Sequence, residues 1–407
     1  GNISGEQGSL DGAGNVQIGR VYNKDHYFNG TIDDVQIYSR ALSQDEVKAI
    51  YNATHNQYSN TFSGLSDGDY SVEAFAQDFA GNVNETGEYS LRVDTTDPFV
   101  NFTEPTPADG ASRSTNDVYI NTTSSDNLND RSVVVDWNKS LVGWWRLNNN
   151  SAYGENDTHV VDFSTYGNNG TVEGGANFTK SGKLGGAYTF DGVDGYVGDI
   201  DNSDDLYDIE KGNKNLTISA WIYPKSLGTN KWGRIIFSTG SVWSNNQYNF
   251  VIHGGQISLH GENSSGDSFF ESFNSIGKNK WQHVTLVFNG THGSFYINGS
   301  WIGNTPEIVG GSIGGSTAYI GTDIGHDYDF NGSIDDVMVF KRALSEQEIK
   351  ALYNATYNSY YRNFTGLDDG DYTVQAFAQD WAGNVNSTGV RTITVAEPPS
   401  GEVLTPT

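Results

Sequence analysis

The chain contains an internal repeat, and this repeat limits its architecture more than any other feature. Residues 28–54 (FNGTIDDVQIYSRALSQDEVKAIYNAT) recur 302 positions later (330 − 28) as residues 330–356 (FNGSIDDVMVFKRALSEQEIKALYNAT). The match continues without a gap, because the segment that begins at Gly64 pairs with the one that begins at Gly366. The 407 residues therefore hold one circularly permuted repeat and about a third of another. A fixed long period predicts an array of one structural unit.

Strand patterns dominate the repeat. Apolar and polar residues alternate between turns rich in Gly, Asn and Asp, which is typical of strands with one buried face. The pattern is clearest in LTISAWIY (216–223), WQHVTLVF (281–288), GSFYING (293–299) and DYTVQAFAQD (371–380). Each copy also contains one short predicted helix, because Ser345 and Glu348 form a capping-box pattern that Ser43 and Glu46 repeat. The sequence therefore predicts an all-β fold with one short helix in each copy of the repeat.

A series of short motifs within the repeat resembles a known family of β-sandwiches. In order, they are LVGWWRL (141–147), DFSTYGNNGTVEG (162–174), GKLGGAYTFDGVDGYV (182–197), LTISAWIYP (216–224), KWQHVTLVFNG (280–290), FYINGSWIG (295–303) and FNGSIDDVMVFKRALSEQEIKALYN (330–354). By these motifs, residues 141–353 resemble the laminin-G-like branch of the concanavalin A-like jelly-roll family. The resemblance implies a jelly-roll sandwich whose first and last strands are neighbours.

The segments on either side resemble bacterial and archaeal Ig-like repeat modules. Residues 97–110, 116–127 and 131–138 resemble the first three strands, and residues 361–395 resemble the last ones. Each half has about 40 residues, which is too few to bury a core without disulfides or metals. Joined, they approach the roughly 100 residues of an Ig domain. We therefore expect the jelly roll to be inserted in an Ig-like β-sandwich, with the whole arrangement repeated in tandem every 302 residues.

Five segments follow from this assignment. Residues 1–53 are the C-terminal part of a laminin-G-like jelly roll, and residues 54–96 are the C-terminal half of its Ig-like host. Residues 97–140 plus 354–396 form the next Ig-like domain around the jelly roll 141–353, and residues 397–407 resemble the first strand of a following one. We expect residues 1–53 to be completed by further chain or by another subunit, since they would otherwise expose a strand edge. The alternative is two independent small domains that flank the jelly roll.

The composition disfavours several functions. With 23 Lys+Arg against 50 Asp+Glu and a formal charge of -27, nucleic acid and anionic membranes are poor partners. The chain has no Cys, and no apolar run reaches the roughly 18 residues of a membrane span. The sequence contains neither the Glu-x-Asp-x-x-Glu strand typical of glycosidases on this fold nor a His-Glu-x-x-His zinc motif. We therefore predict that the protein is not an enzyme.

Dense N-glycosylation sequons indicate an exported protein. Asn-X-Ser/Thr occurs at Asn2, Asn29, Asn52, Asn84, Asn101, Asn121, Asn138, Asn149, Asn156, Asn169, Asn177, Asn215, Asn263, Asn289, Asn298, Asn331, Asn354, Asn363 and Asn386. A chain rich in Asn, Ser and Thr makes some of these by chance, but so many at turn-like positions favour a glycosylated exterior protein. Glycans without disulfides suit an archaeal cell surface better than a eukaryotic secretory pathway.

The laminin-G-like resemblance also implies a structural calcium ion near the ends of the first and last strands. Ca2+ prefers hard oxygen ligands, both carboxylates and carbonyls. The matching positions are Asp162, Asn169, Gly170 through its carbonyl, Asp335 and Asp336, with Asp33 and Asp34 as their counterparts in the partial copy. The alternative is that Asp335 and Asp336 cap a turn. In the Ig-like segments, Asp126 and Asp380 with Asn384 are a further ion candidate, although hairpin turn chemistry explains Asp-x-x-Gly-Asn equally well.

Aromatic residues in polar stretches are candidates for stacking on sugars. Trp243, Tyr248, Phe269 and Phe270 lie in such stretches, whereas Trp144, Trp221 and Trp281 fall on apolar strand positions and are predicted to belong to cores.

Two functions remain after these exclusions. The first is a structural repeat of a secreted, glycosylated cell-surface filament, stalk or S-layer-like coat, stabilised by calcium, whose partners are neighbouring repeats or copies of itself. The second is an adhesin whose laminin-G-like domains bind surface glycans or protein partners.

Overall fold

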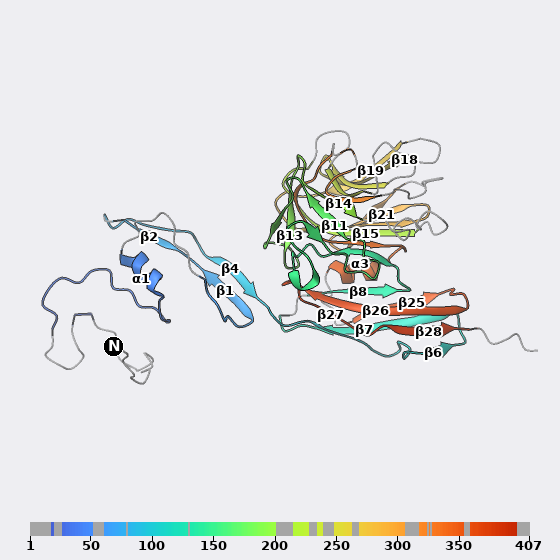
Figure 1. The fold of residues 1–407 in the computed structure, drawn as a ribbon, viewed down its shortest axis with the longest axis horizontal. Helices are drawn as coiled ribbons and strands as arrows, with labels where there is room; N and C mark the ends of the chain where they lie inside the picture. Colours follow the sequence, from blue (N-terminus) through green and yellow to red (C-terminus); the bar gives the residue numbers. More distant parts are fainter. Residues whose placement is uncertain are drawn as a thin grey trace, which may run out of the picture. The chain divides into compact units, whose positions relative to one another are not determined.

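A computed structural model gives the fold of the chain as two compact units, residues 1–65 and residues 66–407 (Figure 1). It describes residues 18–19, 27–51, 61–78, 80–128, 131–200, 215–227, 234–238, 248–262, 268–305, 317–323, 325, 328–353 and 359–396. None of the helices in these ranges is long and apolar enough to cross a membrane.

The first unit contains helix α1 (Gln44–Tyr51). The predicted capping box forms at its start, because the Ser43 N–H donates to Glu46 Oε2 at 2.6 Å and the Glu46 N–H donates to Ser43 Oγ at 3.2 Å. Arg40 pairs with the same Glu46 carboxylate, which is buried. The helix start is thus satisfied by residues that the sequence places next to it.

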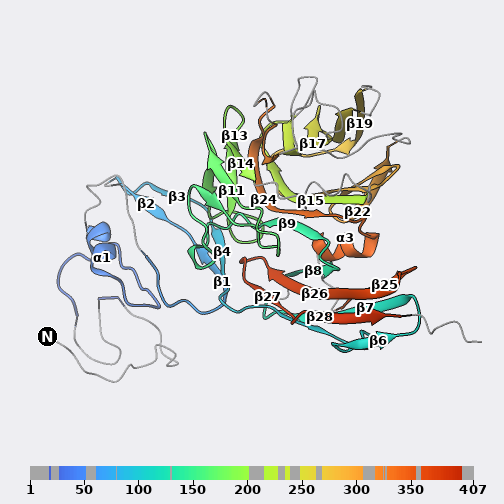
Figure 2. The ribbon, with the colours of Figure 1, turned by 45° about the vertical axis from the view of Figure 1, so that its right-hand side comes forward.

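In the second unit, residues 141–353 form a large sandwich of two eight-stranded antiparallel sheets (Figures 1 and 2). One sheet has the order β10 (His159–Val160), β11 (Gly170–Glu173), β14 (Tyr196–Ile200), β23 (Ala318–Ile320), β16 (Arg234–Ser238), β17 (Tyr248–His253), β18 (Gln256–Glu262), β19 (Ser268–Ser275). The other has the order β12 (Asn177–Thr179), β13 (Ala187–Asp191), β24 (Asn331–Phe340), β15 (Asn215–Pro224), β20 (Gln282–Asn289), β21 (Gly293–Ile297), β22 (Ser300–Asn304), and β9 (Leu141–Trp145) also pairs with β24. The main apolar core lies between these sheets.

The central strands β15 and β24 are buried along nearly their whole length, and their pairing is interrupted once. The register shifts between Ser219 and Trp221, opposite Asp335 and Met338, which places a bulge at Asp336. Asp336 has φ +46°, a left-handed conformation in which Asp is one of the more tolerated side chains. The bulge turns two consecutive acidic residues toward different partners, which is described below.

A smaller sandwich combines the chain before the large one with the chain after it. Its first sheet has the order β25 (Ser359–Thr365), β7 (Asp117–Ser125), β5 (Phe99–Phe102). Its second contains β27 (Val385–Ser387), β26 (Gly370–Asp380), β28 (Arg391–Val395) and β6 (Ala111–Arg113), with β8 (Arg131–Trp137) on β26. Trp137 stacks on Phe364 at 4.1 Å between ring centroids, so both chain segments share one core.

The two sandwiches meet through helix α3 (Glu346–Tyr353) and a third apolar cluster. Figure 2 shows α3 between the large sandwich and strand β8. Buried Glu348 joins the sandwiches, because it pairs with Arg342 at 2.6 Å and with Arg362, and it accepts a hydrogen bond from the Tyr360 hydroxyl at 2.7 Å. Trp144 of β9 and Phe377 of β26 contact edge to face. The large domain is therefore docked on the small one over an apolar surface.

Residues 66–96 contain a second copy of part of the small sandwich. β1 (Gly68–Val72) pairs with β4 (Tyr89–Val93), and β2 (Phe75–Gln77) pairs with β3 (Val83–Glu85). The register repeats as well, since Gly68 is opposite Val93 just as Gly370 is opposite Val395. Burial differs, because Phe75 is 63% exposed while the equivalent Phe377 is 8% exposed. This copy therefore presents an apolar face that its counterpart covers.

Candidate functional site

The loop that follows β10 is organised by Asp162. Its Oδ1 accepts hydrogen bonds from the backbone N–H groups of Trp144 and Ser164, both at 2.8 Å. Its Oδ2 accepts from Ser164 Oγ at 2.7 Å and from the Asn168 N–H at 2.9 Å. Asn169 Oδ1 in turn accepts from the Asp162 N–H at 2.9 Å. The four bonds accepted by the Asp162 carboxylate use the roughly four lone-pair sites of its ionised form, so Asp162 fits poorly as an ion ligand in this arrangement.

Gly170 begins strand β11 and is buried. A Cβ at this position would lie 2.7 Å from Val197 Cγ1, so packing between neighbouring strands requires glycine here. The structure thus places Asp162, Asn169 and Gly170 within one short segment that leads into β11, and the protein itself supplies hydrogen-bond partners for both Asp162 carboxylate oxygens and for Asn169 Oδ1.

Asp335 and Asp336 lie at the bulge of β24 and contact different parts of the molecule. Asp335 Oδ2 accepts from the backbone N–H groups of Lys183 and Leu184 at 2.8 and 2.9 Å, while its Oδ1 is buried without a hydrogen-bond partner. Burial, reinforced by the neighbouring charge of Asp336, raises the pKa of the Asp335 carboxyl well above its usual range.

Asp336 connects the two sandwiches instead. Its Oδ1 accepts from the Trp144 indole N–H at 2.6 Å, and its Oδ2 accepts from Gln379 Nε2 of β26 at 2.8 Å. Burial raises the pKa of Asp336 to about 7, against the lowering effect of the Trp144 hydrogen bond. Trp144 thus bonds both Asp162 and Asp336. Asp33 and Asp34, the counterparts of Asp335 and Asp336 in the partial copy, are exposed, and Asp34 has the same left-handed backbone as Asp336. Calcium at these positions stays a prediction.

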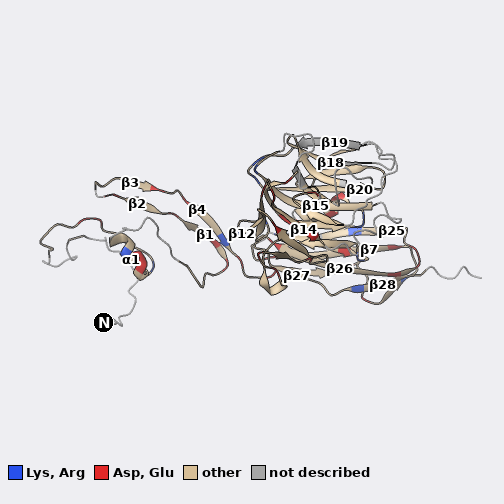
Figure 3. Ribbon diagram, turned by 45° about the horizontal axis from the view of Figure 1, so that its top comes forward, with Lys and Arg blue, Asp and Glu red and all other residues tan. Residues whose placement is uncertain are grey.

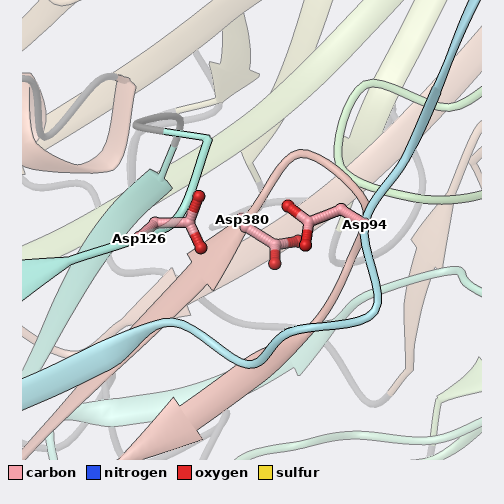
Figure 4. Close-up of side chains that lie close together, drawn as sticks. All are labelled: Asp94, Asp126 and Asp380. Carbon is pink, nitrogen blue, oxygen red and sulfur yellow. The ribbon is translucent and has the colours of Figure 1, made fainter. Parts of the chain in front are cut away.

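Three other carboxylates converge at the end of the small sandwich (Figure 4). Asp94 follows β4, Asp126 follows β7, and Asp380 is the last residue of β26. One oxygen from each lies within 4.8 Å of the others, and among the described residues this is the one group of three acidic, His or Cys side chains that comes so close. Asp94 and Asp380 are buried, and Asp126 is half-buried. We call these residues the acidic cluster.

Each carboxylate of the acidic cluster is oriented by a turn. Asp380 accepts from Asn384 through its backbone N–H and its Nδ2, at 2.9 and 2.8 Å. Asp126 Oδ2 accepts from the Leu128 N–H at 2.8 Å, and Asp94 Oδ1 accepts from the Thr96 N–H at 3.2 Å. The predicted turn chemistry of Asp380 is therefore present, and one oxygen on each of Asp94 and Asp126 is left over.

The electrostatics of the acidic cluster are unbalanced in the described part of the chain. Asp94 Oδ2 and Asp126 Oδ1 are buried without a hydrogen-bond partner, and no Lys, Arg or His forms an ion pair with any of the three residues. Burial, together with the charges of Asp94 and Asp126, raises the pKa of Asp380 to about 7. Two unit charges 4 to 5 Å apart repel by about 3–4 kcal/mol at an effective dielectric constant of about 20. Basic residues are few and dispersed over the ribbon (Figure 3).

Sequence reasoning found two of the three members. Asp126 and Asp380 with Asn384 are an ion candidate in the sequence, with the Asp-x-x-Gly-Asn turn of Asp380 as the alternative explanation, but Asp94 was missed. The available signal was its place immediately after a strand and at the boundary of two modules, in the segment Val93-Asp94-Thr95-Thr96. A residue at a module boundary belongs to neither module's sequence pattern, so the sequence does not show which side chains lie near it in the folded chain.

The linker around Asp94 is held by a fourth acidic residue. Asp67 Oδ1 accepts from both the N–H and Oγ1 of Thr95, at 2.9 and 2.8 Å, and its Oδ2 accepts from Thr96 Oγ1 at 2.5 Å and from Asn127 Nδ2 at 2.9 Å. These bonds, with that of Thr96 the largest, lower the pKa of Asp67. Asp67 thus connects the turn before β1 to the residue that follows Asp126.

The fold of the large sandwich agrees with one comparison of sequences. The profile of the concanavalin A-like lectin/glucanase superfamily matches residues 2–48 and 191–350, which together make up just over half of the chain. The chain belongs to this superfamily. Both matches end at equivalent points of the repeat, since residues 48 and 350 are 302 positions apart. A comparison with curated proteins gives no match.

Solved structures with similar folds are distant. One is domain 4 of the extracellular arabinanase AbnA from Geobacillus stearothermophilus, in complex with arabinotriose (19% identity, 53% of this chain, 98% of that chain, TM-score 0.39). A second is the binding domain of Paraclostridial Mosquitocidal Protein 1 (18% identity, 54% of this chain, 53% of that chain, TM-score 0.42). A third is the receptor binding domain of a botulinum neurotoxin C/D mosaic serotype (19% identity, 53% of this chain, 51% of that chain, TM-score 0.43). The chain spans about half of the two toxin domains. At these TM-scores the likenesses carry no argument about function.

In the concanavalin A-like domain, the structure describes only the backbone of three of the four aromatic candidates for sugar contact. Trp243 lies outside the described residues, as do the side chains of Tyr248, Phe269 and Phe270. The backbone register places Tyr248 of β17 and Phe269 of β19 on either side of Gly261 in β18. Of the predicted core tryptophans, Trp144 and Trp221 are buried, whereas Trp281 is half-buried against Tyr223.

The sequons of the chain lie mostly at the surface. Exposed sequon asparagines are Asn29, Asn84, Asn101, Asn138, Asn156, Asn177, Asn289, Asn298, Asn363 and Asn386. Half-buried ones are Asn121, Asn149, Asn169, Asn215 and Asn331, and the remaining four, Asn2, Asn52, Asn263 and Asn354, lie outside the described residues.

Proposed function

We propose that the chain is a structural repeat of a secreted, glycosylated cell-surface protein, in which concanavalin A-like domains are carried on a line of smaller sandwiches. The observation that carries this proposal is the second copy of the small sandwich in residues 66–96. It repeats the strand register of residues 370–395, so the same pairing of strands recurs after 302 residues. A half-sandwich of this kind is expected where one repeat continues into the next.

The small sandwich is proposed to be an Ig-like domain interrupted by the large one. Its two sheets, its size and its shared core support this, since strands from 99–137 pair with strands from 359–395. Insertion leaves the small sandwiches as the continuous line of the chain, with each large domain projecting from its host. Such a line suits a filament, stalk or S-layer-like coat whose partners are neighbouring repeats.

Export and N-glycosylation are proposed from the position of the sequons. Ten of the fifteen described sequon asparagines are exposed, and loops or strand ends at the surface can accept a glycan without disturbing the core. An archaeal cell surface, where disulfides are not needed for stability, remains our proposed location. We also propose a structural calcium ion at Asp162, Asn169, Gly170, Asp335 and Asp336. If Asp335→Asn changes the melting point by the same amount in calcium and in EDTA, this part of the proposal is wrong.

Immunogold electron microscopy of cells that express the full protein tests the structural role. The account predicts label on the outer surface, on a regular coat or on filaments, and glycopeptides at exposed sequons such as Asn84 and Asn386. Label confined to the cell interior, or unmodified peptides at every sequon, would contradict it.

A second candidate, an adhesin that binds glycans, is favoured by membership in a lectin/glucanase superfamily. The backbone register supports this candidate only in that Tyr248 and Phe269 are both opposite Gly261 in neighbouring strands. A glycan array probed with the isolated chain distinguishes the roles: saturable binding that Phe269→Ala removes supports the adhesin, and a blank array supports the structural repeat alone.

A further inference from the structure

We propose that Asp94, Asp126 and Asp380 bind a calcium ion at the junction between two successive modules. The inference stands on the geometry of the acidic cluster and does not depend on where the protein is located. It also differs from the laminin-G-like calcium position, because it uses other residues in another domain.

The spacing of the three carboxylates suits one shared ion. Ca2+ binds oxygens at about 2.3–2.6 Å, so two ligands on the same ion lie no more than about 5 Å apart. The three oxygens lie within 4.8 Å of one another. Figure 4 shows the carboxylates of Asp94, Asp126 and Asp380 turned toward one another from three separate segments.

An independent observation points to a missing cation. Asp94 is only 9% exposed, and its Oδ2 has no hydrogen-bond partner although its Oδ1 is held by Thr96. Asp126 Oδ1 is likewise buried and unpartnered. A buried carboxylate oxygen ordinarily receives a donor or a metal, because leaving it unpaired costs more than any contact returns. Both free oxygens belong to the acidic cluster, so a single ion would satisfy them together.

The donor set selects the kind of metal. All three side chains are carboxylates, and no His or Cys belongs to the group among the described residues, which disfavours Zn2+. Mg2+ demands a near-ideal octahedron and keeps several waters, whereas Ca2+ accepts irregular oxygen ligands from separate segments. The acidic cluster combines turns from three segments, so calcium fits it best.

The ion would join one module to the next. Asp94 follows the last strand of the earlier copy, Asp126 follows a strand in one sheet of the next sandwich, and Asp380 ends a strand in its other sheet. The Asn384 amide already donates to the Asp94 carbonyl at 3.2 Å, and Asp67 holds Thr95 and Thr96. Calcium would therefore stiffen a linker whose polar contacts are in place but whose charges repel.

Isothermal titration of the metal-free 407-residue chain with Ca2+ at pH 8 tests the site. Asp94→Asn and Asp126→Asn should each lose one calcium equivalent, or bind it more weakly by on the order of tenfold or more. Asp78→Asn is the matched control, because Asp78 is the counterpart of Asp380, accepts the same hydrogen bonds from Asn82, and lies on the exposed earlier copy. It should titrate like the wild type.

Thermal melts of the same variants separate a metal ligand from a purely structural residue. With EDTA, Asp94→Asn should melt higher than the wild type, because it removes a repelling charge, and with calcium it should melt lower. Circular dichroism spectra at about 20 °C, compared with that of the wild type, check that each variant is folded before it is heated. Wild-type calcium stoichiometry in Asp94→Asn and Asp126→Asn, or melting points that keep the same order with and without calcium, would overturn the proposal.

Discussion

At the scale of single residues, Trp144 shows how a correct core assignment conceals a second role. Trp144 is buried as its apolar strand position predicts, yet its backbone and indole N–H groups each donate to a carboxylate. Asp335 and Asp336 are predicted to bind a metal or to cap a turn; the structure shows that they accept hydrogen bonds from backbone, indole and amide groups, and calcium binding by them stays a prediction. Sequence identifies a carboxylate that needs partners, but the partner depends on which distant segment folds against it.

His283 makes the stability of the large sandwich depend on pH. Burial lowers the pKa of His283 to about 3, and its Nε2 lies 2.8 Å from Ser219 Oγ. The folded form keeps the ring neutral while the unfolded chain takes up a proton below pH 6.5, so stability is fully present above pH 6.5 and falls as the pH drops. The expected loss is about 1.4 kcal/mol per pH unit.

Urea unfolding of the wild type and of His283→Gln at pH 7.5, 6 and 5 measures this effect. The variant should be less stable at pH 7.5, because it disturbs a buried contact, but the difference should shrink as the pH falls. A constant difference across the three pH values would show that His283 is not held neutral by burial.

At the scale of elements, periodicity predicted the strands and helices well because their causes are local. The segments 216–223, 281–288, 293–299 and 371–380 match strands β15, β20, β21 and β26, and both capping boxes begin a helix. The bulge at Asp336 was not predicted, since an extra residue in one strand is visible only against its partner. The acidic cluster was predicted only in part. Asp126 and Asp380 lie next to recognisable turns, whereas Asp94 lies at a module boundary and meets them only through long-range folding.

Glu348 of α3 should contribute far more to stability than its helix neighbour Glu346. Glu348 is buried between Arg342 and Arg362 of the two sandwiches, so Glu348→Gln leaves two cations without their counter-charge and should cost about 3–5 kcal/mol. Glu346→Gln breaks only an exposed pair with Lys350 and should cost no more than about 0.5 kcal/mol. Chemical unfolding of both variants gives the comparison, and equal losses would mean that Glu348 does not hold the sandwiches together.

At the scale of the whole molecule, the internal repeat was the most informative signal, since it indicated both the period and the places where modules begin. The structure adds that strands from both sides of residues 141–353 share one core, and that residues 66–96 repeat half of it. Charge and composition could not reveal this, because they do not indicate which strands pair. Long-range strand pairing depends on which faces bury each other, and two short half-sandwich patterns do not specify that by themselves.

The exposed face of residues 66–96 should bind apolar probes. Val72, Phe75, Val83 and Tyr89 are exposed in this copy, whereas Val374 and Phe377 are buried in the later one. A chain of residues 66–396 should therefore enhance the fluorescence of anilinonaphthalene sulfonate, and a chain trimmed to residues 97–396 should do so much less. Equal enhancement by the two chains would place the exposed apolar surface elsewhere.

Small-angle X-ray scattering of polypeptides with one, two and three 302-residue repeats, in calcium, tests the central claim most directly. If successive sandwiches form a continuous line stiffened at each junction, the maximum dimension should rise by the same increment with each added repeat, and less steeply in EDTA. The result that would contradict a structural repeat is a maximum dimension that increases with repeat number no faster than that of a compact particle, both with and without calcium.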